Sequence, residues 1–346
     1  MTIHINWDRA EEVFSILLRA WDNRSYPYRT AFDPHDVARL PRTMLRDGVE
    51  HANFLFCSCY YMRGGIRSDI AIGSLTKLYH RVPRIFNPAW SADRDENYAI
   101  KTVSSALKEN GLAYHADEIA RFWVVNFRKL HTDWGGDIRQ IFVGATSYEE
   151  LCRRIMSNGN KPDSPNGFHG FREKMTSMII YFLADSGLID EFHFPIPVDF
   201  HVMRVMVANQ ILVPETGFND GDAIGLVELQ RAARELTLKY CQKHGVSTLR
   251  LCDAFWHLSR EGCARNLGNK SSEGENRARK TEVTPHVITW NTKEIHAFDA
   301  GCGRCPVNSF CTWNIPPSNY YRTGIILLRG KRPVPPQEKR IQYDLF

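Results

Sequence analysis

Three cysteines lie close together near the end of the 346-residue chain, in the stretch DAGCGRCPVNSFCTW. Cys302, Cys305 and Cys311 follow the spacing C-x2-C-x5-C. Thiols at this density are typical of a metal-binding loop, whose backbone has to wrap around the metal. A tetrahedral zinc ion and an iron–sulfur cluster both take four protein ligands, so we expect a fourth ligand from elsewhere in the chain.

The spacing favours an iron–sulfur cluster over zinc. Zinc sites usually pair two C-x2-C units, or one such unit with a histidine pair, and no second pair follows here. Clusters accept more varied spacing, and Gly303 and Pro306 allow tight turns between the thiols. The candidates for the fourth ligand are Cys57, Cys59, Cys152, Cys241, Cys252 and Cys263. Of these, Cys263 lies closest in sequence, whereas Cys152, Cys241 and Cys252 sit in helical patterns typical of small core residues.

The amino-acid composition bears on the redox state of the cysteines and on the partners of the protein. Nine cysteines, an odd number, indicate reduced thiols plus a metal site rather than a disulfide framework. The N-terminus lacks the basic and apolar segments of a signal peptide, and no apolar run approaches the roughly 18 residues of a membrane span. The net charge of +5 permits a polyanionic partner without requiring one. We expect a cytoplasmic monomer with no membrane contact.

Apolar residues recur at helical spacing along most of the chain, and strand alternation is scarce. The sequence therefore predicts an all-α fold of about ten helices. The predicted helices cover residues 4–21, about 37–62, 66–80, 97–111, 115–130, 147–157, the stretch EKMTSMIIYFLADSG, the stretch VDFHVMRVMVANQIL, 222–243 and 246–262. The polar residues 264–295 are predicted to be an insertion, and the basic, Pro-rich residues 314–346 a tail.

The cysteine loop resembles the iron–sulfur loop of the helix-hairpin-helix DNA glycosylases, in the branch of endonuclease III and adenine DNA glycosylase. The family pattern is C-x6-C-x2-C-x5-C, and its first cysteine ends a helix in a context like H-G-R-x-x-C-x-A-R. LSREGCAR resembles that context. The resemblance thus implies a [4Fe-4S] cluster held by Cys263, Cys302, Cys305 and Cys311, with residues 264–295 inserted in the cluster loop.

Two upstream stretches resemble the same family in the same order. VDFHVMRVM, residues 198–206, resembles V-D-T-H-x-x-R-V. FHGFREKMT, residues 168–176, resembles the hairpin L-P-G-V-G-x-K-T-A, with Gly170 and Lys174 at the matching glycine and lysine and Arg172 in place of the second glycine. The resemblance covers roughly residues 40–313.

The resemblance also implies a domain organisation. Residues 1–45 would form an N-terminal helix and loop that pack on the cluster lobe. Residues 46–190 would form a helical barrel lobe with the helix-hairpin-helix at about 160–187. Residues 191–313 would carry the catalytic aspartate helix and the cluster, which gives a two-lobed helical fold.

Asp199 and Lys174 are the predicted catalytic residues. Cleavage of a base–sugar bond develops positive charge on the sugar, which a carboxylate beside the anomeric carbon stabilises. Asp199 precedes a helix after an apolar lead-in; its alternative role is a plain helix cap. A desolvated Lys174 amine could attack the sugar and form a Schiff base, which would add a strand-cleaving lyase step. The alternative for Lys174 is an ordinary lysine that reaches solvent or phosphate.

Several residues are candidates for contacts with double-stranded DNA. The hairpin residues Gly170, Phe171 and Arg172 are expected to bind phosphate at a turn and helix N-terminus. A flipped base leaves a gap that Tyr60, Tyr61, Met62 and Arg63 could fill, although core packing is an equal alternative for either tyrosine. His201 and Arg204 are expected to support their helix or to contact phosphate, and Arg304 to reach the DNA backbone from the cluster loop.

These residues predict a DNA N-glycosylase that releases a damaged or modified base and leaves an abasic site. The long Lys-to-Asp spacing and the insertion after Cys263 suggest an unusual or bulky modified base, for example in bacteriophage DNA. Two alternatives remain open. One is a non-catalytic helix-hairpin-helix DNA-binding protein, and the other is a glycosylase that acts on free nucleosides or nucleotides.

Overall fold

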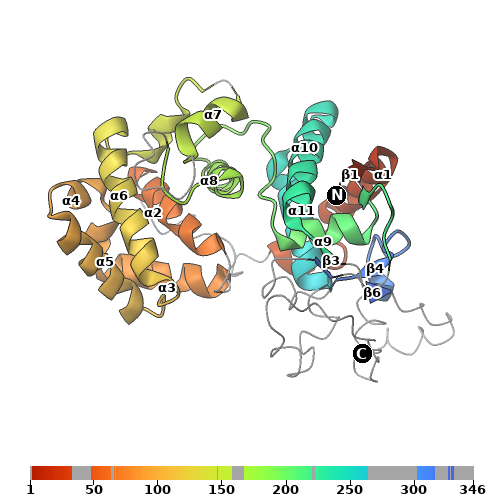
Figure 1. Ribbon diagram of the computed structural model, residues 1–346, viewed down its shortest axis with the longest axis horizontal. Coiled ribbons are helices and arrows are strands. Elements are labelled where there is room, and N and C mark those ends of the chain that lie inside the picture. Colours follow the sequence, from red (N-terminus) through yellow and green to blue (C-terminus); the bar gives the residue numbers. More distant parts are fainter. Residues whose placement is uncertain are drawn as a thin grey trace. The chain divides into compact units, whose positions relative to one another are not determined.

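Helices make up most of the protein. The computed structural model describes residues 2–32, 48–63, 66, 68–145, 147–157, 167–219, 223–263, 302–315, 326–327 and 329–330. Strands among these residues form only short antiparallel pairs, so the predicted all-α class is confirmed at the level of helix content (Figure 1). None of the described helices combines the length and the apolar character needed to cross a membrane.

The contacts divide the chain into two compact units. The cysteine unit comprises residues 1–33 and 198–346, and the hairpin unit comprises residues 34–197. The sequence predicted boundaries near residues 45 and 190; the contacts instead change between 33 and 34 and between 197 and 198. The N-terminal helix therefore belongs to the same unit as the cysteine loop.

The hairpin unit is built from helices, three of which begin with a side-chain cap. The helices are α2 (Gly48–Cys59), α3 (Ser68–Arg81), α4 (Pro88–Ala92), α5 (Glu96–Glu109), α6 (Ala116–Trp134), α7 (Tyr148–Ile155) and α8 (Glu173–Asp185), with 3-10 turns at Tyr60–Arg63, Pro83–Phe86 and Ile138–Phe142. The side chains of Asn87, Asp95 and Ser147 accept backbone N–H groups at the starts of α4, α5 and α7. Gly135, with a φ of 63°, ends α6 in the left-handed conformation.

The core of the hairpin unit is rich in aromatic rings. Phe56 of α2 stacks on Phe171 with 4.9 Å between centroids and meets Phe168 edge-on at 5.2 Å. Phe127 and Trp123 of α6 extend the cluster. Rings of this size contribute a large apolar area together with favourable stacking geometry, so the segment before α8 is fixed to α2 by packing.

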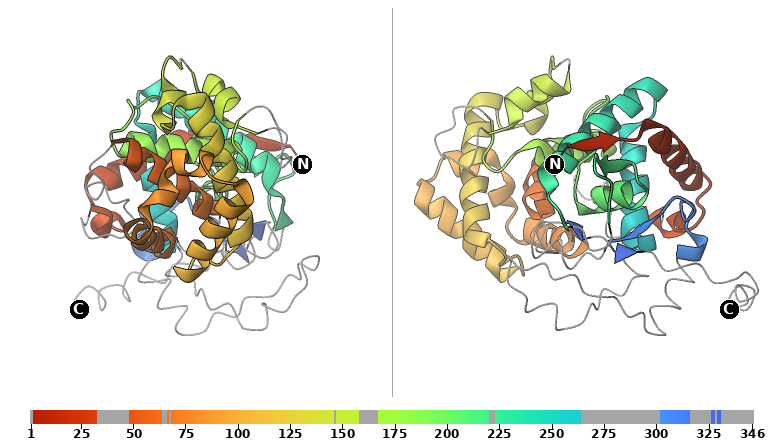
Figure 2. Two further views of the ribbon diagram at one scale, coloured as in Figure 1. Left: turned by 90° about the vertical axis from the view of Figure 1, so that its left-hand side faces the viewer. Right: turned by 45° about the vertical axis from the view of Figure 1, so that its right-hand side comes forward.

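The cysteine unit combines both ends of the chain. Its elements are β1 (Ile3–Ile5), α1 (Trp7–Asp22), a 3-10 turn (Tyr28–Phe32), α9 (Phe200–Ala208), β2 (Leu212–Pro214), β3 (Ala223–Ile224), α10 (Leu226–His244), α11 (Thr248–His257), a π-helix (Leu258–Cys263), a 3-10 turn (Cys302–Arg304), β4 (Trp313–Asn314), β5 (Ile326–Leu327) and β6 (Arg329–Gly330). Phe14 of α1 packs edge-on against Tyr240 of α10 and Phe255 of α11, at 4.7 and 5.0 Å. β1 pairs with β2, with Ile3 opposite Pro214 and Ile5 opposite Leu212 (Figure 2).

Two predictions about the C-terminal part of the chain have different outcomes. The insertion at 264–295 lies outside the described residues. Within the predicted tail, 314–346, two described pieces form strand pairs: β5 pairs with β3, and β6 pairs with β4. The expectation of a tail from residue 314 is therefore wrong for these pieces, because strands of two residues are too short to show an alternating pattern in the sequence.

Candidate metal centre and catalytic residues

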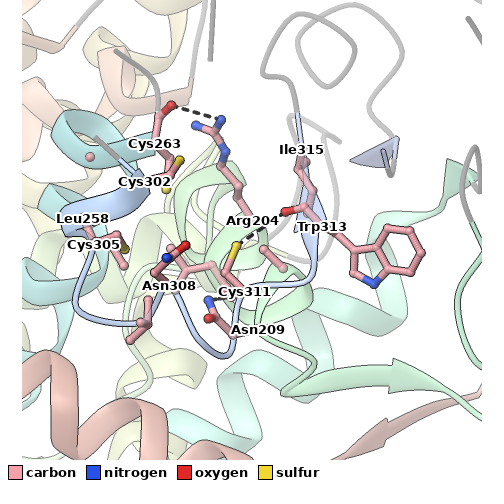
Figure 3. Close-up of a pocket in the computed structure, with 14 residues that line it drawn as sticks. Arg204, Asn209, Leu258, Cys263, Cys302, Cys305, Asn308, Cys311, Trp313 and Ile315 are labelled. Atoms are coloured by element: carbon pink, nitrogen blue, oxygen red, sulfur yellow. Dashed lines mark hydrogen bonds between the residues drawn. The ribbon is translucent and has the colours of Figure 1, made fainter. Parts of the chain in front are cut away.

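The four cysteines predicted as ligands line one pocket of the cysteine unit (Figure 3). Cys263 ends the π-helix, and Cys302, Cys305 and Cys311 come from the loop that begins with the 3-10 turn. Backbone hydrogen bonds shape this loop: Cys305 N–H donates to the Cys302 carbonyl at 3.2 Å, and Cys311 N–H to the Val307 carbonyl at 3.1 Å. The fold thus brings together cysteines that the sequence separates by the whole of residues 264–301.

The pocket is small and mostly apolar. Its volume is about 40 Å³. Apolar side chains of α9, the π-helix and the loop surround the thiols, among them Val205, Ala208, Leu258, Val307 and Ile315. An apolar shell excludes water from a metal centre and tunes its properties.

The chemistry of this donor set fits an iron–sulfur cluster. Zinc needs four sulfurs each about 2.3 Å from one ion, whereas in a [4Fe-4S] cluster each thiolate binds a different iron, so the ligands surround a larger volume. Among the described residues, no group of three or more His, Cys, Asp or Glu side chains meets the geometry of a metal site, so the assignment depends on the spacing of the four cysteines and on the pocket that they share. Burial raises the pKa of the Cys305 thiol well above its usual range, and the neighbouring Cys263 and Cys311 thiols raise it further. A thiolate at this position therefore needs a cation beside it.

The other cysteines lie outside the pocket lining. Cys241 and Cys252 are buried in α10 and α11, as expected of core residues, and Cys152 is half-buried in α7. Cys57 and Cys59 are buried in α2, where burial raises the pKa of both thiols well above the usual range. Inert thiols of this kind contribute packing rather than reactivity.

Asp199 is the N-cap of α9. Its Oδ1 accepts the backbone N–H groups of His201 at 2.8 Å and Val202 at 3.2 Å. Phe194, Ile196 and Val198 are buried, so the apolar lead-in holds the half-buried aspartate at the helix start. Within the part of the chain that the structure describes, the hydrogen bonds to this carboxylate all fall on Oδ1. Its Oδ2 is thus left for another partner.

Arg204 has a different role from the DNA contact that we considered. The side chain is only 2% exposed, lines the cysteine pocket and donates from Nη2 to the Cys263 carbonyl oxygen at 3.5 Å. In Figure 3 it extends from α9 toward that carbonyl. The prediction of a phosphate contact for Arg204 is therefore wrong, because the α9 face that carries it points into the pocket; the predicted helix-supporting role agrees with this position.

The hairpin residues fall into two groups. Gly170 has a φ of 80°, which favours glycine, and the Arg172 side chain is exposed at the start of α8. Phe171, in contrast, is 0% exposed, so its side chain belongs to the aromatic core and is not a DNA contact. Lys174 is half-buried, and its Nζ donates to the Met62 carbonyl oxygen at 2.7 Å. Lys174 belongs to the hairpin unit and Asp199 to the cysteine unit.

The two wedge tyrosines pack in the core. Tyr60 and Tyr61 are 1% and 2% exposed. Tyr60 accepts a hydrogen bond from Asn126 Nδ2 at 2.7 Å, and the Tyr61 hydroxyl donates to the Leu112 carbonyl at 3.5 Å. The wedge prediction is wrong for both, because each hydroxyl has a partner inside the unit and each ring is enclosed. Met62, the third wedge candidate, is half-buried, and the side chain of the fourth, Arg63, lies outside the described part of the structure.

Arg304 is exposed on the cysteine loop, where the sequence predicts a DNA contact. Its guanidinium lies over the ring of Tyr26, 4.5 Å from the centroid. A guanidinium that lies over an aromatic ring can still donate hydrogen bonds from the N–H groups at its edge. This arrangement is compatible with phosphate binding from the loop.

Two buried polar residues were not predicted from the sequence. Asn126 of α6 is 0% exposed and fixes the hairpin turn before α8: it donates to the His169 carbonyl at 2.9 Å and accepts the His169 N–H at 2.7 Å. Ser259, also 0% exposed, lies 2.9 Å from His201 Nδ1. Neither residue carries a motif of its own, so only the fold reveals its partners.

Comparison with known proteins does not assign the chain to a family. No family model matches the chain, and no curated protein matches it. The likeness to helix-hairpin-helix glycosylases therefore depends on the residues named above and on the chemistry that they can perform.

Proposed function

We propose that the protein is a DNA N-glycosylase, which removes an unusual or bulky modified base from double-stranded DNA. The observation that carries the proposal is the association of two features in one unit. Four cysteines line a pocket against α9, and the same helix begins with the half-buried Asp199. This combination, together with the upstream hairpin sequence, supports the iron–sulfur branch of the family.

Asp199 is the proposed catalytic carboxylate. Breakage of the bond between base and C1′ sends the bonding electrons to the base and leaves positive charge on the sugar. The Oδ2 oxygen can face that charge, while Oδ1 stays bonded to two backbone N–H groups. The N-terminus of α9 also favours the ionised carboxylate. A water molecule then bonds to C1′ and its proton passes to the released base, which leaves an abasic site.

Lys174 is the proposed nucleophile of a bifunctional reaction, in which a lyase step follows base release. Its free electron pair would attack C1′ in place of water as the base leaves, and opening of the C1′–O4′ bond would give a Schiff base. Removal of a C2′ proton would then break the C3′–O bond to the 3′ phosphate. The hydrogen bond to the Met62 carbonyl fixes the position of the amine at the start of α8. Proton loss from Nζ is required before attack, so the lyase step depends on the neutral amine.

The cysteines are proposed to hold a [4Fe-4S] cluster with a structural role. Cys263, Cys302, Cys305 and Cys311 would each supply one thiolate. A cluster in this position would brace the loop that presents Arg304. Measurement of iron and acid-labile sulfide in freshly purified protein tests the assignment, with about four of each expected per chain. Stoichiometric zinc without sulfide would overturn it.

A panel of duplexes, each with a single modified base, tests the function. We expect base release from at least one bulky or hypermodified pyrimidine or purine, such as those of bacteriophage DNA. Cleavage of ordinary repair lesions alone would contradict the substrate proposal. Tight duplex binding without release of any base favours a non-catalytic binding protein, and release only from free nucleosides favours the nucleoside glycosylase.

A further inference from the structure

His201 connects the proposed catalytic carboxylate to the segment that carries Cys263. Its backbone N–H donates to Asp199 Oδ1 at 2.8 Å. Its ring Nδ1 lies 2.9 Å from Oγ of Ser259, at hydrogen-bond distance. Ser259 is fully buried in the π-helix, four positions before Cys263. One residue in the first turn of α9 thus touches Asp199 on one side and the cysteine-bearing helix on the other.

The π-helix gives this contact its geometry. α11 ends at His257 and continues directly into Leu258–Cys263 with the wider π turn. Single π turns are uncommon and occur frequently at functional sites, because the wider turn re-aims the side chains that follow. Here Ser259 faces α9, and the Cys263 carbonyl accepts from Arg204, one turn further along α9.

The other end of α9 is attached to the second cysteine segment. Thr312, the residue after Cys311, donates its N–H to the Ala208 carbonyl at 2.7 Å. Its hydroxyl accepts from Gln210 Nε2 at 2.6 Å. Both segments that supply thiols to the pocket are therefore hydrogen-bonded to α9, one near its start and one at its end.

We propose that His201 and Ser259 are positioning residues, whose hydrogen bond aligns the first turn of α9, and with it Asp199, on the metal-binding segment. The role of this alignment in catalysis rests on the proposed function. The link itself, by which we mean the His201–Ser259 hydrogen bond between α9 and the π-helix, does not. Ordering of the cysteine segments then orders the cap of α9 as well. The sequence separation of Asp199 and Cys263 gives no indication of this dependence.

Hydrogen exchange at the His201 and Val202 amides tests the link without any activity measurement, because both amides donate to Asp199 Oδ1. Ser259→Ala should accelerate their exchange about 3- to 10-fold, the factor that one hydrogen bond contributes. Ser259→Thr should restore near-normal rates. In a His201→Ala background, Ser259→Ala should add no further acceleration.

Ser58→Ala is the matched control. It removes an equally buried hydroxyl that donates only within its own helix, to the Phe54 carbonyl at 2.9 Å, and should leave exchange in α9 unchanged. Unchanged His201 and Val202 exchange in Ser259→Ala would overturn the link. So would equal acceleration throughout α10 and α11, since that indicates general destabilisation.

Kinetics connect the link to catalysis. With a base that the wild type releases, Ser259→Ala should lower kcat about 10-fold while KM and iron content stay unchanged, because small misplacement of a catalytic group affects the chemical step. An unchanged kcat, or a loss of iron that accounts for the drop, would overturn the positioning role. If the wild type releases no base at all, the proposed function fails, and the exchange experiment still decides the link.

Discussion

The Asp199 carboxylate caps α9 and is the proposed catalytic group, and one substitution can separate the two roles. Asparagine caps helices as well as aspartate does, so Asp199→Asn should keep the bonds to the His201 and Val202 amides and preserve folding. It removes the negative charge that we propose stabilises the sugar. We expect base release to fall at least about 100-fold, with DNA affinity retained.

The matched control for this change is Asp95→Asn. Asp95 caps α5 in the same way, by accepting the Tyr98 N–H at 2.9 Å. It should keep full activity, which separates loss of charge from loss of a cap. Activity in Asp199→Asn close to that of the wild type would show that the carboxylate is only a cap.

The Lys174 amine can be examined by chemical trapping. Borohydride reduces a Schiff base to a stable protein–DNA adduct, so the wild type should give such an adduct if the amine attacks the sugar. Lys174→Ala should lose the adduct but retain part of the base release, because Asp199 remains. Lys129→Ala, which removes a half-buried lysine paired with Asp133 in α6, should trap normally. An adduct that persists in Lys174→Ala would assign the Schiff base to a different amine.

At the level of elements, Asn126 links α6 by hydrogen bonds to the hairpin turn before α8. Asn126→Ala leaves the buried His169 N–H and carbonyl and the Tyr60 hydroxyl without this partner. Loss of these bonds should reduce the free energy of unfolding by about 3 kcal/mol and weaken duplex binding through disorder of the Gly170 turn. Chemical denaturation and a binding titration measure the two effects. Asn97→Ala, at an exposed position of α5, is the control. Equal stability of the two variants would contradict the stabilising role of the Asn126 hydrogen bonds.

The sequence predicted the positions of the helices better than it predicted which of their side chains are buried. Periodicity located α5, α6 and α7 to within a few residues, and Asp199 was recognised as a cap because caps depend on local chemistry. The motif also grouped Cys263 with the three loop cysteines, which line one pocket. Tyr60, Tyr61, Phe171 and Arg204 were misassigned for a common reason: all four are buried, and burial depends on which segments pack against them.

At the level of the whole molecule, the cysteine unit is assembled from segments that are distant in the sequence. β1 at the N-terminus pairs with β2, and Cys263 meets a loop that follows the long stretch 264–301. Closing such long connections costs conformational entropy, which the proposed cluster would offset because a metal centre binds only when its ligands are together. The hairpin unit, formed by one continuous segment, contains none of the four cysteines that line the pocket.

Loss of one ligand should therefore affect the two units unequally. Cys263→Ser should lose most of the iron and sulfide and lower the unfolding temperature of the cysteine unit by about 10 °C, the shift that roughly 3 kcal/mol produces in a unit of this size. Exchange protection in α5 and α6 should stay at the wild-type level. Cys241→Ala, which changes a fully buried thiol of α10 outside the pocket lining, should keep its iron. Iron retained in Cys263→Ser, or protection lost equally in both units, would show that Cys263 is not a ligand or that the metal does not stabilise the cysteine unit selectively.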